Sequence, residues 1–292
     1  MDFSTRKENS PNDPPPEAYT MDEATPSPSF PLPYEILEMI TAHLTYDLAD
    51  LKACSLTCHS WYSASVPLLH HTLTLRERPF ETDRIRLVLS KLHDLGLAHL
   101  VKEIRVKQRR DGNPLFVPQA FSHRHLPSFA NVQTLRFQEL DMIHLFIPAI
   151  GNCFKNFSLT VRSIALSNPH CTPRQLSHFL SLFPNLDNIE ILNNYTYMHD
   201  PTALDTDLVS FSAPKPRGRL VLFNFSWVET WTHLIASCGD LRFRHMDLRW
   251  SASCAPILLK ACAETLETLR FCTSYAQVGK YFRTPGLSAS LS

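Results

Sequence analysis

The stretch "LPYEILEMITAHLTYDLADLKACSLTCHSW" runs from Leu32 to Trp61 and predicts the first folded unit of the chain. It follows an opening segment, residues 1–31, that holds seven prolines and six acidic against two basic residues. Such a composition buries too little apolar surface to offset the entropy of ordering, so we expect a disordered tail over residues 1–30. Within the quoted stretch, apolar residues recur at the spacing of one helix face. They are Ile36, Leu37, Ile40 and Leu44.

Three short helices are expected between residues 31 and 69. Pro33 suits the first turn of the first helix, because the N–H that it lacks has no intrahelical partner there. Asp47 is placed to cap a second helix that begins near Leu48, and Trp61 follows on a third short helix. A unit of roughly forty residues is marginal on its own, so the pattern favours a partner that covers its apolar ends.

The ordered elements of this stretch resemble the F-box motif from end to end and without a gap. The resemblance is carried by Leu32-Pro33-x-Glu35-Ile36-Leu37, Ile40, Leu44, Leu48, Leu51, Ser55-Leu56-x-Cys58 and Trp61. It implies a Skp-family adaptor as partner and, through that adaptor, the cullin and RING subunits of a ubiquitin ligase. By the family pattern, the residues expected to contact the adaptor are Leu32, Pro33, Ile36, Leu51, Cys58 and Trp61. Spacing alone would favour a different interpretation, in which these residues only pack the core of a small bundle.

A second regularity begins after residue 70, where short runs of the form apolar-x-x-apolar-x-apolar recur. The runs start at Val101, Val132, Val161, Leu186, Phe243 and Leu266. A further strand-like run, "RGRLVLFNF" at 217–225, fills the one wide gap between them. From Ile104 to Leu269, 165 residues divided into six intervals give an average period of about 27, within the roughly 20–29 of leucine-rich repeats.

Helical stretches separate these runs, so each unit is expected to contain a helix, a turn and a strand. The helical stretches are residues 174–183, 228–237 and 255–264, with 84–100 as the first helix and "HTLTL" at 71–75 as the first strand. Strands that return through a helix lie parallel in one sheet. The region resembles the degenerate repeats of fungal F-box proteins with leucine-rich repeats. Only Asn194 occupies the asparagine position of that family's repeat.

The expected fold class is therefore α/β. It consists of a three-helix F-box bundle (31–69), then a short, irregular leucine-rich-repeat-like solenoid with parallel strands and outer helices (70–280), and a tail (281–292).

In each strand, the residue between the last two apolar positions should point away from the helices, toward the concave face. These residues are Arg105, Arg136, Ala165, Glu190, Asp247 and Arg270. An ordinary solvated face is one interpretation of this row. The alternative hypothesis is that Arg105, Arg136, Glu190, Asp247 and Arg270 bind a partner segment of mixed charge, with a phosphate near the arginines as one option.

Composition excludes several other classes of function. Lys and Arg number 28 and Asp and Glu number 28, so no net basic field favours nucleic acid. No apolar run reaches the roughly 18 residues of a membrane span, and the start of the chain lacks the apolar segment of a secretory signal, so we expect a cytoplasmic or nuclear protein.

Eight cysteines lack any Cys-x-x-Cys pair and are expected mostly to pack in the core. The cluster Cys54, Cys58 and His59 is likewise interpreted as packing, and we expect no metal and no cofactor.

The sequence thus predicts a non-catalytic adaptor. The bundle would bind the Skp adaptor, the repeats would bind an unidentified protein substrate, and proximity to a charged enzyme elsewhere in the complex would do the chemistry. One alternative is a repeat scaffold that engages no ligase. Another is an enzyme that uses Cys153, Cys171 or Cys238 beside a histidine, although no spacing of these residues supports it.

Overall fold

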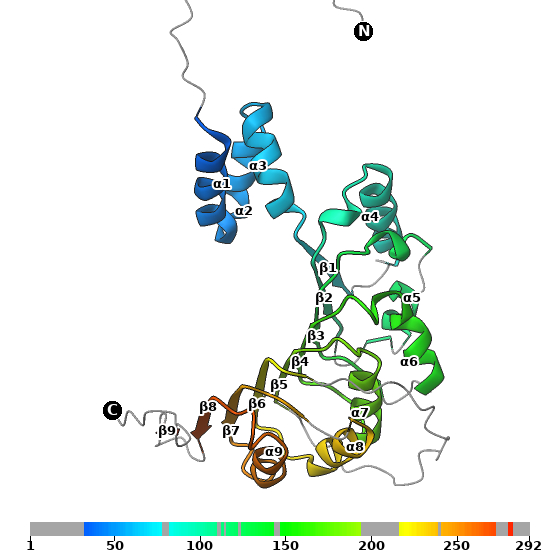
Figure 1. The fold of residues 1–292 in the computed structure, drawn as a ribbon. Coiled ribbons are helices and arrows are strands. Elements are labelled where there is room, and N and C mark those ends of the chain that lie inside the picture. The colour runs from blue at the N-terminus through cyan, green and yellow to red at the C-terminus, as the bar shows by residue number, and fades with distance from the viewer. Residues whose placement is uncertain are drawn as a thin grey trace, which may run out of the picture.

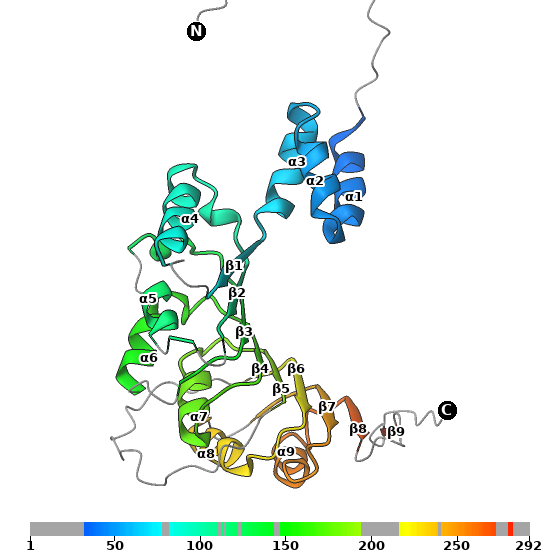
Figure 2. The same ribbon diagram turned by 180° about the vertical axis from the view of Figure 1, so that it is seen from behind.

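The computed structural model describes residues 32–77, 82–109, 112–113, 115–121, 124–142, 147–193, 216–238, 241–272 and 280–282. The tail expected over residues 1–30, Asn194 and most of the tail expected over 281–292 therefore lie outside the described residues. Within them, a helical unit is followed by one curved sheet whose helices line a single side (Figures 1 and 2). The chain thus combines helices and strands, as expected.

The N-terminal unit is a bundle of α1 (Tyr34–His43), α2 (Leu48–Ser55) and α3 (His59–Leu69), with a 3-10 turn at Leu44–Tyr46. Pro33 was expected in the first turn of the first helix but is the N-cap residue that precedes α1. The Asp47 carboxylate caps α2, because its Oδ1 accepts hydrogen bonds from the N–H groups of Ala49 at 2.9 Å and Asp50 at 3.1 Å. Trp61 lies on the third helix, α3, as expected, and this helix has 11 residues.

The sheet contains eight parallel strands in chain order, with a ninth strand paired antiparallel to the eighth. The parallel strands are β1 (Thr72–Arg76), β2 (Glu103–Lys107), β3 (Thr134–Gln138), β4 (Ser163–Ser167), β5 (Asn188–Leu192), β6 (Arg219–Phe223), β7 (His245–Arg249) and β8 (Thr268–Cys272). Every apolar run of the sequence contributes one of them. The antiparallel β9 (Lys280–Phe282) was not expected. The arrangement is an open, solenoid-like sheet.

The helices that connect the strands are α4 (Thr82–Asp94), α5 (Phe116–Phe121), α6 (Ile147–Phe154), α7 (Pro173–Ser181), α8 (Val228–Cys238) and α9 (Ala255–Ala261). Four of them, α4, α7, α8 and α9, confirm the helical stretches of the sequence. The Thr172 side chain and Gln175 form a reciprocal capping box at the start of α7. Two helices, α5 and α6, were not anticipated from the sequence.

A repeated turn ends five of the strands, β3 to β7. The residue after each strand has a φ between 51° and 59°, the left-handed region that asparagine tolerates better than most residues. These residues are Glu139, Asn168, Asn193, Asn224 and Trp250. Each donates its backbone N–H to the carbonyl of the last residue of the next strand at 2.7–2.9 Å. Three of these five turn residues are asparagines, and they occupy a position that the sequence interpretation overlooked.

The core lies between the sheet and its helices, and its centre is aromatic. Phenylalanine rings from α5, β3, α6 and α7 pack there with centroid separations such as 4.7 Å for Phe121–Phe154 and 5.2 Å for Phe154–Phe179. The buried aromatic residues of this cluster are Phe121, Phe137, Phe154, Phe157, Phe179 and Phe183. Because rings from successive units interlock, each unit depends on its neighbours for a closed core.

Candidate functional site

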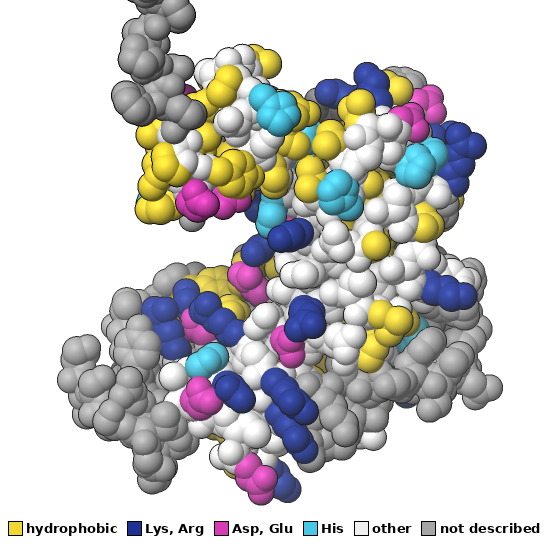
Figure 3. Space-filling model, turned by 45° about the horizontal axis from the view of Figure 1, so that its top comes forward, with side chains coloured by type: hydrophobic (Ala, Val, Ile, Leu, Met, Phe, Trp, Pro, Cys, Tyr) yellow, Lys and Arg dark blue, Asp and Glu magenta, His cyan; other side chains and the backbone are white. Residues whose placement is uncertain are grey.

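An apolar surface covers the N-terminal bundle. Among the described residues, eight of the thirteen exposed large hydrophobic side chains fall between Leu32 and Tyr62, and Figure 3 shows hydrophobic side chains gathered there. We call these eight the bundle surface. They are Leu32, Tyr34, Ile36, Met39, Ile40, Leu48, Leu56 and Tyr62. Soluble proteins rarely leave contiguous apolar patches exposed without an interaction to cover them.

The bundle has its own core, so the exposed side chains are not needed to hold it together. Leu37 is 3% exposed, Leu51 is 0% exposed, and both Ala64 and Val66 are buried. Thr41 is buried beside them, and its hydroxyl donates a hydrogen bond to the Leu37 carbonyl at 2.9 Å. The apolar side chains thus divide into an inner set that stabilises the bundle and an outer set that faces solvent.

This division sorts the residues expected to contact an adaptor. Leu32 and Ile36 are exposed, at 50% and 40%, and Pro33 and Cys58 are exposed as well. Trp61 is half-buried on α3. Leu51 was expected to contact the adaptor, but its complete burial makes it a core residue. The expected adaptor contacts also missed six residues of the bundle surface, namely Tyr34, Met39, Ile40, Leu48, Leu56 and Tyr62.

The concave side of the sheet carries the second candidate surface. The strand register aligns the residues predicted to point there, in the order Arg105, Arg136, Ala165, Glu190, Val221, Asp247 and Arg270. Thr74 of β1 continues the row at one end. Parallel strands in register place these side chains about 4.8 Å apart along the row. The sequence therefore predicted the alignment, while Val221 was not among the expected residues.

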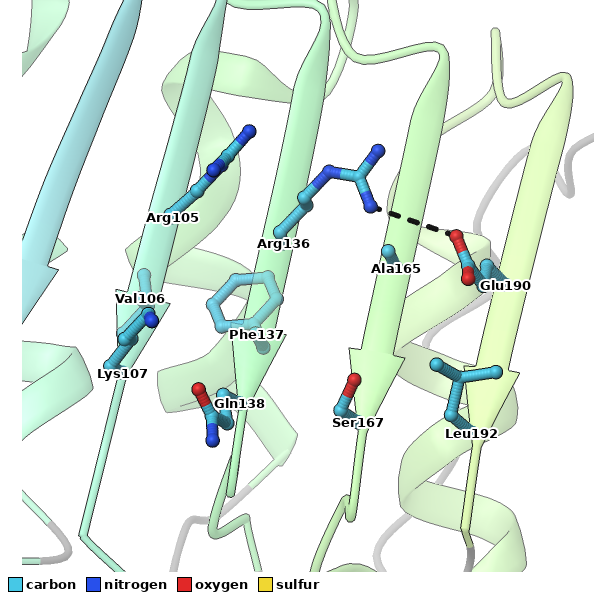
Figure 4. Close-up of a pocket in the computed structure, with 10 residues that line it drawn as sticks. All are labelled: Arg105, Val106, Lys107, Arg136, Phe137, Gln138, Ala165, Ser167, Glu190 and Leu192. Carbon is cyan, nitrogen blue, oxygen red and sulfur yellow. Dashed lines mark ion pairs between the residues drawn. The ribbon is translucent and has the colours of Figure 1, made fainter. Parts of the chain in front are cut away.

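One half of this row is a network of paired charges. The Glu103 carboxylate, whose side chain is 11% exposed, accepts a hydrogen bond from Nε of Arg105 at 2.6 Å and forms an ion pair with Arg136, whose Nε lies 2.8 Å from Oε1. Arg136 also reaches across Ala165 to Glu190, with Nη1 3.6 Å from Oε2 (Figure 4). The hydrogen bond with Glu103 raises the pKa of the Arg105 guanidinium. Two arginines and two carboxylates thus balance one another.

A hollow of about 410 Å³ opens beside this network. Ala165 and Ser167 of β4, which have small side chains, lie between Lys107 and Gln138 on one side and Leu192 on the other (Figure 4). The hollow mixes apolar, cationic and amide groups.

The other half of the row centres on Asp247, whose side chain is 5% exposed. Arg249 binds it through two hydrogen bonds, Nε to Oδ1 at 2.9 Å and Nη2 to Oδ2 at 2.6 Å. Arg219 lies 3.8 Å and Arg270 lies 3.9 Å from the same Oδ2. Three guanidinium groups, from β6, β7 and β8, therefore lie within 4 Å of the one carboxylate of Asp247. We call these four residues the arginine cluster.

The structure gives little support to a catalytic thiol at the cysteines considered as nucleophiles. Burial raises the pKa of the Cys153 and Cys171 thiols, which keeps them protonated at neutral pH and makes them poor nucleophiles. The side chain of Cys238 lies outside the described part of the structure. Cys58 is exposed and Cys54 is partly exposed, so the core-packing interpretation does not hold for Cys58.

Searches for metal-binding groups and membrane spans cover only the residues that the structure describes. No three His, Cys, Asp or Glu side chains gather there in a group that would hold a metal ion. None of the helices in that part of the chain has both the length and the apolar character needed to cross a bilayer.

Comparison with known proteins identifies the bundle. The F-box-like family profile matches residues 31–76, which span α1, α2, α3 and the first sheet strand, β1. No curated protein matches the chain. F-box domains are adaptor modules that generally bind Skp1-type adaptors, and residues 31–76 of this chain form an F-box-like domain.

Proposed function

We propose that this chain is the substrate-recognition subunit of a Skp-cullin-F-box ubiquitin ligase. The observation that carries the proposal is the bundle surface, which gathers exposed apolar side chains on a domain that matches the F-box-like family. A Skp-family adaptor would cover this surface, and the adaptor would connect the chain to cullin and RING subunits. The residues proposed to contact the adaptor are Leu32, Pro33, Ile36, Cys58 and Trp61, together with the rest of the bundle surface.

The sheet region would hold the target protein. We propose that residues 70–280 form a degenerate leucine-rich-repeat-like domain. Eight parallel strands that return at a period of about 27 residues support this assignment. Its concave row offers Arg105, Arg136, Glu190 and Arg270 for contact with a target, whereas Asp247, also expected to make contact, is buried beneath the neighbouring arginines. No residue of this chain need be catalytic, because holding a target close to a charged enzyme raises its effective concentration.

Adaptor co-purification tests the proposal. Full-length chain carrying an affinity tag is co-expressed with a Skp-family adaptor, and the adaptor retained on the resin is quantified. Wild type should retain the adaptor, and the double variant Leu32→Ala, Pro33→Ala should retain much less, because both side chains are exposed and apolar. Circular dichroism should show that the double variant keeps its helices and sheet.

Leu159→Ala is the matched control, because Leu159 is 71% exposed but lies outside the bundle. It should leave adaptor retention unchanged. If wild type retains no adaptor, or if the bundle variant and the control retain equal amounts, the ligase assignment is wrong. The chain would then be better described as a repeat scaffold that binds proteins without a ligase.

A further inference from the structure

A second group of exposed apolar side chains lies on α4, the first helix after the bundle. Leu87 is 54%, Val88 is 37% and Leu95 is 69% exposed. With the bundle surface, they make up eleven of the thirteen exposed large hydrophobic side chains among the described residues. The other two, Leu115 and Leu159, belong to later units of the sheet. The exposed apolar side chains are therefore concentrated at one end of the molecule.

The exposed apolar residues of α4 share one side of the helix with Lys91. Val88, Lys91 and Leu95 follow one another at i, i+3 and i+7, and Leu87 precedes Lys91 by four residues, the spacings at which helical side chains are neighbours. Leu95 continues the last turn, since its N–H donates to the Lys91 carbonyl at 3.0 Å. We call Leu87, Val88, Lys91 and Leu95 the α4 flank.

The contacts of α4 show which way this flank faces. Leu89 is fully buried in the core between the helices and the sheet. The ring of His93 packs on His125, which precedes β3, with ring centroids 4.5 Å apart, so this side of α4 faces the next units of the sheet. At about 100° per residue, Val88 and Leu95 fall on the other side of Leu89 from His93. The flank therefore faces away from the following units, toward the open end of the sheet.

Nothing in the described part of the chain closes this end. β1 pairs with β2 alone and forms the edge of the sheet. Among the described residues, α4 makes extensive contact with α5 and with the 3-10 turn at Ala98–Leu100, and no helix of the bundle does so. Stacks of repeats normally end in a unit with a polar outer side, because an apolar end is left in contact with water. The α4 flank lacks that polar character.

The bundle surface lies at the same end of the molecule as the α4 flank. The bundle directly precedes β1 and α4 directly follows it, so both stand beyond the edge of the sheet (Figures 1 and 2). Residues 70 and 71 alone join α3 to β1, which keeps the bundle close to the sheet. A protein that docks on the bundle is therefore within reach of α4.

We propose that the adaptor that covers the bundle surface also packs against the α4 flank, through an apolar segment with an acidic group facing Lys91. An interface of standard size takes about 20–30 residues on each partner, more than the eight residues of the bundle surface supply. The α4 flank extends the same apolar surface across the junction with the sheet. Lys91 has no ion-pair partner among the described residues, so a carboxylate of the adaptor would complement it.

Contact on both sides of the junction has a consequence for target binding. An adaptor held only by the bundle leaves the two-residue connection between α3 and β1 as the one link that orients the sheet. An adaptor that also holds α4 fixes the bundle and the sheet relative to each other. The concave side of the sheet would then keep a constant position with respect to the rest of the ligase, which favours transfer to a bound target.

This inference rests on the proposed function, because the adaptor is the partner that it names. The test uses purified full-length chain and a purified Skp-family adaptor. Hydrogen exchange is measured with and without the adaptor, and affinity is measured by calorimetric titration. The adaptor should slow the exchange of residues 83–95 in addition to that of residues 34–69, because a docked protein excludes water from both surfaces.

The triple variant Leu87→Ala, Val88→Ala, Leu95→Ala should bind the adaptor about tenfold more weakly than wild type, because apolar contact area is lost. Lys91→Glu should also weaken binding, by about threefold or more, since it places like charges opposite each other. The double variant Leu115→Ala, Leu159→Ala is the matched control and should bind like wild type, because both leucines are exposed but lie away from the α4 flank. If the triple variant unfolds, Lys91→Glu decides the outcome, because this side chain is exposed.

The possible failures of the two proposals differ. If the adaptor binds and protects residues 34–69 but not residues 83–95, or if the α4 variants bind as tightly as wild type, the inference is wrong and the proposed function stands. If wild type binds no adaptor at all, both are wrong. An equal loss in the control and in the triple variant would show a general effect of surface leucines. Self-association of wild type that the triple variant abolishes, measured by analytical ultracentrifugation, would assign the flank to a second copy of the chain.

Discussion

The same leucine-to-alanine change made at two positions, five residues apart, should separate docking from stability in the bundle. Leu56 is 86% exposed and Leu51 is 0% exposed, although both were part of the motif that identified the bundle. Full burial of a leucine side chain stabilises by about 1.5–3 kcal/mol. Leu56→Ala removes less than a full leucine side chain from the contact, because alanine keeps one methyl group. It should therefore weaken adaptor binding by about 1–2 kcal/mol, or about 5- to 30-fold.

Leu51→Ala should act through folding. Removing a fully buried leucine side chain costs about 2–5 kcal/mol, because a cavity remains where the side chain packed. A bundle of this size has little stability to spare, so Leu51→Ala should open it, whereas Leu56→Ala should change its stability by about 0.5 kcal/mol or less. Hydrogen exchange of residues 34–69 reports this difference directly, since amide protection follows the free energy of local opening.

The assay combines that measurement with titration of the adaptor against each full-length variant. Leu56→Ala should keep wild-type amide protection and lose adaptor affinity, and Leu51→Ala should lose protection first. The reasoning is refuted if Leu56→Ala binds the adaptor as tightly as wild type. It is equally refuted if Leu51→Ala keeps full protection, because that residue would then not be the core of the bundle.

Three further predictions concern stability. Phe179→Ala should lower the free energy of unfolding by about 3–5 kcal/mol in urea titrations, because the ring is fully buried and packs on Phe154 and Phe183. Burial lowers the pKa of His178, so the unfolded chain binds more protons than the folded chain below about pH 6.5, and stability falls as the pH drops through that value. His178→Gln should flatten this fall between pH 7.5 and 5.5, measured by urea midpoints. Asp47→Ala should cost the bundle about 1 kcal/mol through loss of the α2 cap, read out by hydrogen exchange.

The strands of the sheet were predictable because their signal is repeated and local. A parallel strand covered by helices on one side needs two inward apolar residues, and this requirement produces the apolar-x-x-apolar-x-apolar run each time. Leu135 and Phe137 of β3 meet it, as do Met246 and Leu248 of β7, and all four are buried. Register then follows, since a one-residue slip would turn every inward side chain outward.

The helices were less predictable where they are short or interrupted. Residues 116–121 and 147–154 form α5 and α6, and each contains a proline, Pro118 or Pro148, that weakens a helical pattern in the sequence. The turns after the strands were missed for another reason. Asn168 and Asn224 adopt the left-handed conformation one residue before the position at which the family's asparagine was sought.

Burial within the bundle was the hardest feature to read from spacing. Ile36 and Leu37 are adjacent and equally apolar, yet one is 40% and the other 3% exposed. Helical periodicity marks an apolar side of α1 that is wide enough to serve two surfaces, one against α3 and one toward solvent. Periodicity cannot divide them, because the division depends on where the neighbouring helices lie.

The ion pairs on the concave face could not be predicted from spacing either, because they join residues of neighbouring strands. Glu103 was never a candidate, since it opens β2 on a position that alternation predicts to be exposed, yet it is buried beneath Arg105 and Arg136. A zero net charge for the chain likewise conceals a sheet face on which the outward residues of β1 to β8 include seven cations and three carboxylates. The charge that this face presents therefore depends on which carboxylates the register brings beneath which arginines. Glu103 has two arginine neighbours and Asp247 has three, because the register aligns Arg219 of β6 and Arg270 of β8 with the ends and middle of β7.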